Sequence, residues 1–493
     1  MDPHKPLIPV QYAHTLPAVA TFPLYDRSNL GCGIAHIGVG NFHRAHQALY
    51  LHEYLQTHPH DWMVHGVGLL DSDVDLFTAM TSQDCLYTLT ERSGTQDTLK
   101  VIGSIKRLSL APAGSEGVIR LLASADIKIV SLTITEKGYY YTASSDLDAD
   151  NPVIRADLAG EGAPRSAFGY LYAAAAKRMA EGGPAFTVMS CDNLPGNGHM
   201  TRRLLLQFAE MKDPAVARWI GDNVAFPNSM VDRITPAVTD KTTAFVRDTF
   251  GVDDRCPVVS EAYLQWVLED NFAAGRPALE EVGVQVTSDV EPYEKLKVRL
   301  LNGSHSALSY PAYLMGYREV DAAMRDPAIR AYVQQYMDVD ITPTVPPVPG
   351  IDLAAYKQTL VERFSNPAIS DQVQRLAMDG SAKARNAWVP PLEHQLATGG
   401  SIRWLAFALA AWYRYLYGTD EAGDPIEIAD PLRDELVARA RSAPDDPTAL
   451  LSMREIFGER PAADGRLAAA VKESLDAIRG TGTRQALERL LRQ

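Results

Sequence analysis

The stretch Ile34–Tyr50, "IAHIGVGNFHRAHQALY", decides the fold of this chain, because it runs from an apolar strand through two glycines into a helical pattern. In dinucleotide-binding units the first glycine permits a tight turn, and the second lets the backbone approach a pyrophosphate. Gly38 and Gly40 fit these two positions. His43 stands where the pattern has its third glycine, so we expect the helix to pack less closely on its strand or to enter at another angle.

Four residues of this turn are predicted contacts of a nucleotide cofactor: Gly38, Gly40, Asn41 and Phe42. A helix that starts here would present unpaired backbone amides and the positive end of its dipole to a pyrophosphate. A strand-to-helix turn that binds nothing is the alternative, and the glycine motif alone does not exclude it.

The next apolar run, "WMVHGVGLL", ends at Asp71. A carboxylate at this point would accept hydrogen bonds from an adenosine ribose and repel a 2′-phosphate, which favours NAD over NADP. Asp71 follows Gly40 by 31 residues, whereas about 20 is usual. Asp73 and Asp75 are therefore competing candidates, and an ordinary loop aspartate is the other interpretation.

Strand-like and helix-like segments alternate around this motif from residue 33 to about residue 285. The strand-like runs are "GIAHIGVG", "WMVHGVGLL", "IKIVSLTIT", "AFTVMSC" and "VGVQVTSDV". Such alternation is typical of a parallel, doubly wound sheet. After about residue 290, apolar residues three and four positions apart indicate helices instead. We predict an α/β protein with a Rossmann-like dinucleotide-binding domain (1–288) and a mostly α-helical substrate and catalytic domain (289–493).

The composition excludes several classes of partner. With 61 acidic and 47 basic residues, the net charge of −14 disfavours binding to nucleic acid or to anionic membranes. No apolar run approaches the roughly 18 residues that a membrane helix needs. A small-molecule partner is therefore the prediction.

The N-terminal residues 1–22 contain prolines and histidines where a secretory signal would have a compact apolar block. The cysteines form no Cys-x-x-Cys pair and no metal-binding spacing; they are Cys32, Cys85, Cys191 and Cys256. Such a pattern suits a reducing compartment without structural disulfides. We therefore predict a cytoplasmic location.

Five histidines between residues 43 and 60 raise the hypothesis of a metal site; they are His43, His46, His52, His58 and His60. No carboxylate or cysteine completes a tetrahedral set at a typical spacing. Histidines on the outer face of an amphipathic helix are the simpler interpretation. The sequence therefore predicts no metal.

The segment "KVRLLNGSH", Lys297 to His305, places an amine, an amide and an imidazole among leucines. In an α-helix Lys297, Asn302 and His305 would fall within an arc of about 140°. A lysine that serves as an acid and base needs its pKa, near 10.4, lowered towards about 7 to 8, and burial has that effect. An amide can stabilise a developing alkoxide. The alternative is that Lys297 reaches solvent while the other two satisfy each other.

Six ordered blocks of the chain resemble the long-chain polyol dehydrogenases/reductases, the mannitol 2-dehydrogenase group. The blocks are "GVGNFHRAHQ", "VSLTITEKGY", "SCDNLPGNG", "FPNSMVDRITP", "KVRLLNGSH" and "ERFSNPAISDQVQRLAMDGSAK". "FPNSMVDRITP" is the most specific of them, and the resemblance extends over essentially the whole chain.

This resemblance implies catalytic roles. It suggests Lys297 as the general base that takes the proton of the reacting hydroxyl. Asn193 and Asn302 are similar to an amide pair around the substrate oxygen at C2, and His305 to a histidine that binds substrate hydroxyls and positions the lysine.

The resemblance also implies a substrate set. Asp232 is similar to a substrate-contacting carboxylate, and Arg375 and Lys383 to residues that hold the distal hydroxyls. Glu294 resembles a glutamate on a proton path to solvent.

The function implied is a reversible, metal-independent and NAD-dependent oxidation of a polyol at C2, D-mannitol to D-fructose, with D-arabinitol and D-sorbitol as further substrates. The resemblance favours a monomer. Three alternatives stay open: a hexuronate reductase acting on D-fructuronate and D-mannonate, a protein that binds NAD without catalysis, and a zinc enzyme.

Overall fold

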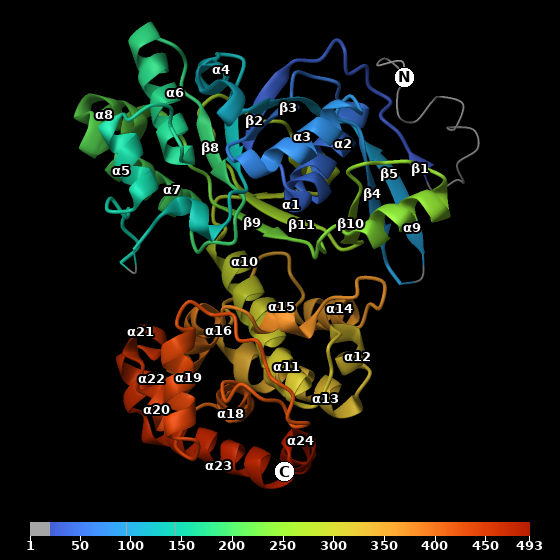
Figure 1. The fold of residues 1–493 in the computed structure, drawn as a ribbon, viewed down its shortest axis with the longest axis vertical. Coiled ribbons are helices and arrows are strands. Elements are labelled where there is room, and N and C mark those ends of the chain that lie inside the picture. The colour runs from blue at the N-terminus through green and yellow to red at the C-terminus, as the bar shows by residue number, and fades with distance from the viewer. Residues whose placement is uncertain (1–19, 95, 143) are drawn as a thin grey trace. The chain divides into compact units, whose positions relative to one another are not determined.

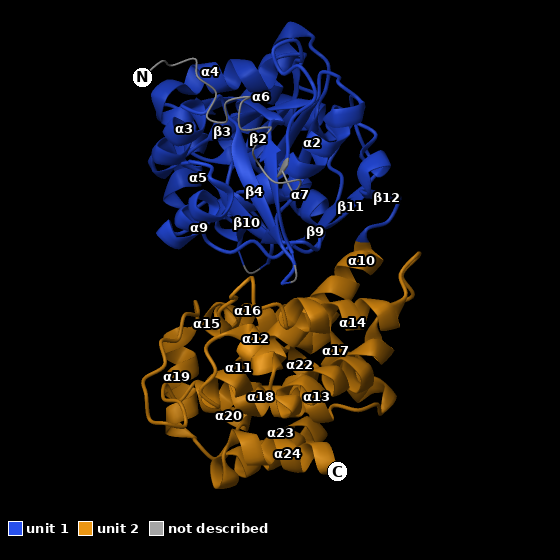
Figure 2. Cartoon of the chain, turned by 90° about the vertical axis from the view of Figure 1, so that its right-hand side faces the viewer, with its two compact units in different colours: residues 1–290 blue, residues 291–493 orange. Residues whose placement is uncertain are grey.

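The computed structural model describes residues 20–94, 96–142 and 144–493. The prediction that the chain has no secretory signal rests on residues 1–22. Of these, residues 1–19 lie outside the described residues. The chain divides into two compact units, residues 1–290 (unit 1) and residues 291–493 (unit 2) (Figure 2).

Unit 1 is built on a five-stranded sheet with the strand order β6-β3-β2-β7-β8, in which every neighbouring pair is parallel. The strand order reverses direction at β2, between β3 and β7. The strands are β2 (Cys32–Ile37), β3 (Met63–Gly68), β6 (Ile105–Leu110), β7 (Ile129–Leu132) and β8 (Thr187–Ser190). In open parallel sheets, ligands bind outside the carboxyl ends of the strands at such a switch point.

Both faces of this sheet are covered, which explains its continuous apolar strands (Figure 1). On one face, Ala35 and Ile37 of β2 pack with α4 and α6. On the other face, Ile34 packs with α2 and α3. Successive side chains of a strand point to opposite faces, so β2 contributes to two separate cores. The prediction of a doubly wound sheet is confirmed.

Two smaller sheets extend unit 1, and sequence reasoning had identified little of them. One has the order β1-β5-β4-β10, and the other the order β12-β11-β9. Their strands are β1 (Ala20–Thr21), β4 (Tyr87–Arg92), β5 (Asp97–Ile102), β9 (Ser229–Asp232), β10 (Val258–Glu261), β11 (Gln265–Glu269) and β12 (Gln285–Thr287).

The helices of unit 1 connect these strands. They are α1 (Asn41–Ala45), α2 (Gln47–Thr57), α3 (Val74–Thr81), α4 (Ala111–Ala123), α5 (Pro152–Ala159), α6 (Ala167–Glu181), α7 (Asn197–Lys212), α8 (Pro214–Asn223) and α9 (Asp240–Phe250). Among the described residues of this unit, three short 3₁₀ turns accompany them: η2 (Asp71–Asp73), η3 (Glu136–Tyr139) and η4 (Leu279–Val282).

Unit 2 is helical throughout, and all of its residues belong to the described part of the chain. Its α-helices are α10 (Glu291–Leu296), α11 (Gly303–Leu314), α12 (Val320–Met324), α13 (Pro327–Gln335), α14 (Leu353–Phe364), α15 (Val373–Ala377), α16 (Gly380–Lys383), α17 (Val389–Thr398), α18 (Arg403–Tyr415), α19 (Arg433–Ser442), α20 (Thr448–Leu451), α21 (Arg454–Phe457), α22 (Glu459–Ala463), α23 (Gly465–Thr481) and α24 (Thr483–Arg492). The predicted helical character of this half is confirmed.

Three π-helical segments interrupt these helices: η5 (Lys297–Asn302), η6 (Tyr336–Ile341) and η8 (Ala384–Trp388). A 3₁₀ turn, η7 (Thr342–Thr344), follows η6. The core of the unit is formed by α11 and α18, which are buried along most of their lengths and pack against each other. In the described parts of the chain, no helix combines the length and the apolar character needed to cross a bilayer.

Candidate active site

The glycine turn after β2 has the geometry expected of a nucleotide loop. Gly38 has a φ of +95°, and a Cβ there would lie 2.2 Å from the carbonyl oxygen of Thr133. Only glycine fits this position, because the turn is left-handed and passes directly over the end of β7. Gly40 is exposed, and a Cβ there would have no neighbour nearer than 3.9 Å. The backbone at Gly40 is therefore open to the close approach of a phosphate group.

Two buried histidines, His36 and His43, pack next to the turn at Gly38. The ring of His36, on β2, shares hydrogen bonds with Ser131 Oγ at 2.8 Å and Thr133 Oγ1 at 2.9 Å. Thr133 Oγ1 in turn donates to the carbonyl oxygen of Gly38 at 2.7 Å. His43 stacks on His36 with ring centroids 3.4 Å apart. Burial lowers the pKa of His36 to about 3, so its ring is uncharged at neutral pH.

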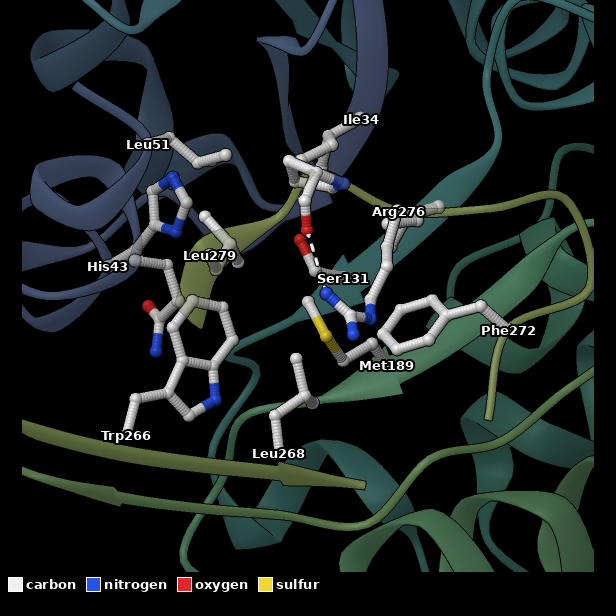
Figure 3. Close-up of a pocket in the computed structure, with 13 residues that line it drawn as sticks. Ile34, His43, Leu51, Ser131, Met189, Trp266, Leu268, Phe272, Arg276 and Leu279 are labelled. Carbon is white, nitrogen blue, oxygen red and sulfur yellow. Dashed lines mark hydrogen bonds between the residues drawn. The ribbon is translucent and has the colours of Figure 1, made fainter. Parts of the chain in front are cut away.

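A small cavity of about 10 Å³ lies next to His43 (Figure 3). Its lining includes His43, Ser131, Met189, Trp266 and Leu268. A cavity needs about 10 to 15 Å³ to admit one water molecule, so this space is far too small for a nucleotide. The open side of Gly40 is therefore the face of the turn at which we expect a cofactor.

The side chains of the other two predicted cofactor contacts, Asn41 and Phe42, interact with neighbouring protein side chains. Asn41 Oδ1 accepts a hydrogen bond from Arg44 Nη2 at 2.6 Å. Phe42 stacks on His46 with ring centroids 5.0 Å apart. The helix stops at His46, where φ and ψ are −121° and −86°, and α2 then begins. His43, at the third position of the glycine motif, is thus accommodated in two ways. Its ring stacks flat on that of His36, and the helix that carries it is interrupted at His46.

Asp71 is exposed and follows the last residue of β3, Gly68, by three positions. Its competitor Asp73 is occupied, because its Oδ2 accepts the backbone N–H of Leu70 at 3.0 Å. Two apolar side chains beside Asp71 are unusually exposed: Leu70 by 59% and Val74 by 41%. A carboxylate flanked by open apolar surface suits the ribose and adenine of a dinucleotide. The residues present therefore fit such a cofactor.

Asn193 and Asp232 are placed at the ends of strands in unit 1. Asn193 is exposed in the turn that follows β8. Asp232 is the last residue of β9 and is buried. Its neighbour Arg233 fixes this strand end by donating to the carbonyl of Ala45 at 2.6 Å and to a carboxylate oxygen of Glu91 at 2.5 Å.

The histidines considered for a metal site form no common cluster. His43, His46 and His52 are buried, so the expectation that they lie on an outer helix face was wrong. His46 Nε2 is 2.8 Å from the carbonyl oxygen of Gln265, and His52 Nδ1 is 2.9 Å from the hydroxyl of Tyr25. Across the described ranges, no three His, Cys, Asp or Glu side chains gather as a metal would require.

The segment with Lys297 and Asn302 is a π-helix rather than the α-helix assumed from sequence. A π-helix bonds residue i to residue i+5, so residues five positions apart lie one above the other. Lys297 and Asn302 have this spacing. In an α-helix the same two side chains would be about 140° apart. The amine and the amide therefore leave the same side of the helix, with the lysine buried and the asparagine half-buried.

His305 lies on α11, one turn after Asn302, and is half-buried. Its Nε2 has no hydrogen-bond partner among the described residues. Burial is the main cause that holds the pKa of His305 well below its usual value. The cations that add to this effect are, in order of size, Arg375, Arg363, Lys383 and Lys297. The ring is therefore neutral and can both accept and donate hydrogen bonds.

The two predicted distal cations differ in their protein partners. Arg375 makes a bidentate ion pair with Asp371, with N–O distances of 2.7 and 2.5 Å. Lys383 Nζ donates to the carbonyl oxygen of Leu376 at 2.9 Å. Burial, and then the charge of Arg375, lowers the pKa of Lys383 to about 8. The charge of Arg375 is therefore balanced by a carboxylate, whereas Lys383 Nζ contacts an uncharged carbonyl oxygen.

Glu294, the predicted proton-path residue, lies half-buried on α10, one turn before Lys297. Lys297, Asn302, His305, Arg375 and Lys383 all belong to unit 2. The structure of this unit thus brings an amine, an amide and a neutral imidazole onto one helix, with further cations around the imidazole. Such a set can exchange a proton with a hydroxyl and hold the remaining hydroxyls of a sugar chain.

Sequence reasoning missed three features of these sites. Arg363 belongs to the cations around His305, but its place in an ordinary helical pattern gave no sign of this. The π-helix was missed because its apolar spacing resembles that of an α-helix. Thr135, after β7, has a φ of 61° and a ψ of 163°. A β-branched residue in this region is strained, and such strain is a signal of function that only coordinates reveal.

The sequence matches two patterns of known protein domains. The Mannitol dehydrogenase Rossmann domain matches residues 32–281, and the Mannitol dehydrogenase C-terminal domain matches residues 289–479. The chain is 44% identical over 482 residues to mannitol 2-dehydrogenase of Neosartorya fischeri, covering 96% of each chain. It is 43% identical over 467 residues to mannitol 2-dehydrogenase of Pyricularia oryzae, covering 93% of each.

Two solved structures are similar along nearly the whole chain. The mannitol 2-dehydrogenase of Pseudomonas fluorescens, in a ternary complex with NAD and D-mannitol, has a TM-score of 0.89 and 44% identity. That similarity covers 98% of this chain and 99% of the other. A substrate-free D-sorbitol dehydrogenase also has a TM-score of 0.89, with 38% identity and coverage of 97% and 99%.

Proposed function

The chain belongs to the mannitol dehydrogenase family, and from that premise we propose that it is an NAD-dependent polyol 2-dehydrogenase. The reaction is the reversible oxidation of D-mannitol to D-fructose. The observation that carries this proposal is the similarity, across 98% of the chain, to the mannitol 2-dehydrogenase whose complex holds NAD and D-mannitol. As a member of this family, the protein is an oxidoreductase.

NAD would accept the hydride that leaves C2 of the polyol. Gly38 and Gly40 would hold its pyrophosphate, because Gly38 permits the tight turn and the backbone at Gly40 is open. Asp71 would accept the ribose hydroxyls and repel the extra phosphate of NADP.

Lys297 would take the proton of the C2 hydroxyl during oxidation and return it during reduction. Asn302, one π-turn further along, would donate its amide N–H to the same oxygen as negative charge develops there. His305 is neutral, so it can bind a neighbouring hydroxyl without competing for the proton. Glu294 would pass the proton between Lys297 and solvent.

Two further residues are proposed to contact the substrate. Asn193 is proposed as the second amide donor to the oxygen at C2, and Asp232 as an acceptor for a substrate hydroxyl. In unit 2, Arg375 and Lys383 would hold the distal hydroxyls. Nothing in these roles requires a metal ion.

D-Arabinitol and D-sorbitol are proposed as additional substrates. A second candidate function is the reduction of D-fructuronate to D-mannonate. The observation that favours it is the number of cations around His305, since a terminal carboxylate needs a cationic partner. Against it, the charge of Arg375 is already matched by Asp371.

We further propose that the protein acts in the cytoplasm as a monomer, which a size measurement in solution would test.

The proposed function is tested by initial rates of nicotinamide absorbance with chelator-treated protein. NAD and NADP are crossed with D-mannitol, D-arabinitol, D-sorbitol and D-mannonate. Reduction of NAD by the polyols is the expected result, and persistence of activity after chelation would dispose of a zinc mechanism. Activity with D-mannonate alone would select the second candidate. Binding of NAD without turnover of any substrate would instead identify a non-catalytic protein.

A further inference from the structure

Asn193 sits at the tip of a tight turn whose shape is set by its neighbours. The backbone N–H of Leu194 donates to the carbonyl oxygen of Asp192 at 2.9 Å, which closes a three-residue γ-turn around Asn193. The turn is joined to the sheet by the N–H of Cys191, which donates to the carbonyl of Leu132 at 2.9 Å. The direction of the exposed Asn193 side chain therefore depends on how firmly the Asp192 carbonyl is held.

A buried amide holds that carbonyl. Asn197, the first residue of α7, is 2% exposed. Its Nδ2 donates to the carbonyl of Asp192 at 3.1 Å and to the carbonyl of Ser229 at 2.8 Å. Its Oδ1 accepts the backbone N–H of Ser229 at 2.9 Å. One side chain thus links the turn that carries Asn193 to the first residue of β9, the strand that ends at Asp232.

The side chain of Asp192 holds the other edge of the turn. Its two carboxylate oxygens accept the backbone N–H groups of Ile134 at 3.0 Å and Thr135 at 2.9 Å, and the hydroxyl of Tyr139 at 2.8 Å. Thr135 is the residue with the strained backbone, so this carboxylate maintains an unfavourable conformation. Strain of this kind persists only where the surrounding structure enforces it.

We infer that Asn197 and Asp192 are positioning residues for the reaction, which orient the Asn193 amide toward the substrate oxygen without touching the substrate. The inference rests on the proposed function, in which Asn193 is a donor to the oxygen at C2. Misplacement of a catalytic group by about 1 Å costs about 100-fold in rate. The side-chain hydrogen bonds of Asn197 to Asp192 and Ser229 are placed to prevent such a displacement.

The chain offers a matched control in Asn228. Its Oδ1 accepts the backbone N–H groups of Gly198 at 3.0 Å and His199 at 3.2 Å, and so it holds the same end of α7. Within the described residues, no hydrogen bond joins the Asn228 side chain to Asp192 or to the backbone of Ser229. Asn228→Ala therefore loosens the same helix end while leaving the turn around Asn193 anchored.

The test is a double-mutant cycle on the full-length protein, with kcat/KM for D-mannitol and the Kd for NAD from tryptophan fluorescence. Asn197→Ala should lower kcat/KM about 100-fold, as expected for misplacement of a catalytic group. Its effect should be on kcat, with the Kd for NAD changed less than about 2-fold. In the Asn193→Ala background, the same change should cost less than about 3-fold, because nothing remains to be oriented. Asn228→Ala should cost less than about 3-fold in either background.

Equal losses from Asn197→Ala in both backgrounds, or an equal loss in the Asn228→Ala control, would overturn the inference and leave the proposed function intact. Asp192→Asn provides the same cycle where Asn197→Ala does not fold, since it keeps the side-chain shape and removes one acceptor oxygen. Wild-type protein that turns over neither polyol nor sugar acid would overturn the proposed function and, with it, this inference.

Discussion

Gly303, directly after the π-helix, tests whether the packing of unit 2 fixes the geometry of the amine and the amide. A Cβ at this position would lie 2.5 Å from the hydroxyl oxygen of Tyr336, a ring that is fully buried. The carbonyl of Gly303 also accepts a hydrogen bond from Trp388 Nε1 at 3.2 Å. Gly303→Ala is therefore the smallest change that presses on the turn after Asn302.

The magnitude follows from two opposing effects. Alanine in a helix is favoured over glycine by about 1 kcal/mol. Overpacking of a buried site costs about 1 to 3 kcal/mol. A contact of 2.5 Å is well inside van der Waals distance, so we take the upper part of this range, about 2 to 3 kcal/mol. The net loss is then about 1 to 2 kcal/mol, or a fall in Tm of about 2 to 8 °C for a unit of this size. Because Asn302 is displaced with the turn, kcat/KM should fall about 10-fold.

Tyr336→Phe should reverse both effects. Without the hydroxyl, the nearest atom to the new methyl group is the ring Cζ of Tyr336 at 3.6 Å, an ordinary contact. The hydroxyl has no hydrogen-bond partner among the described residues, so its removal leaves no group unsatisfied. The double variant should regain the Tm and the activity of the wild type.

Thermal unfolding and initial-rate kinetics on the two single variants and the double variant provide the measurement. Gly480→Ala is the control, because Gly480 lies in α23 with open space around it, and this change should raise stability slightly. A Gly303→Ala variant as stable and active as the wild type would refute the reasoning. A loss that Tyr336→Phe does not relieve would refute it too.

Three further outcomes follow from the individual side chains. Lys297→Ala should lower kcat by about 100- to 10,000-fold, the usual contribution of a general base, with the Kd for NAD unchanged; near-normal turnover would contradict its role. Lys383, with a pKa of about 8, is charged below that pH and neutral above it, so the KM for the polyol should rise as the pH passes through 8. Lys383→Arg keeps its charge and should abolish that rise, whereas an identical profile would exclude Lys383 from binding. Asp71→Ser should improve kcat/KM for NADP relative to NAD by at least about 10-fold, and an unchanged ratio would assign the ribose to another residue.

The parallel sheet and the glycine turn were predictable because they depend on local patterns. Apolar runs followed by helical spacing specify strands that are buried on both faces, and Gly38 stands where the left-handed turn requires a glycine. The smaller sheets were not predictable in the same way. β4 pairs with β10, which lies more than 160 residues further along the chain, and no local pattern encodes that partner.

The site shows the same division between local and non-local information. The resemblance supplied Lys297, Asn302 and His305 as a set, but the helical pitch that aligns the first two is not encoded in their spacing. Segments of π-helix depend on packing, here against η6 and η8, which lie about 35 and 85 residues away. The role of Asn197 was hidden for the same reason, since Ser229 is distant in sequence.

Both units hold their candidate functional groups on irregular backbone, and in each case buried contacts maintain the irregularity. Asn193 is presented by a γ-turn next to the strained Thr135, and the turn is tied down by Asp192 and Asn197. Lys297 lies in a π-helix that ends where Gly303 admits the ring of Tyr336. Irregular backbone of this kind costs about 1 to 3 kcal/mol at each site. Substitutions that relax these segments should therefore cost activity even where they leave stability unchanged or improve it, and this separates positioning residues from residues of the core.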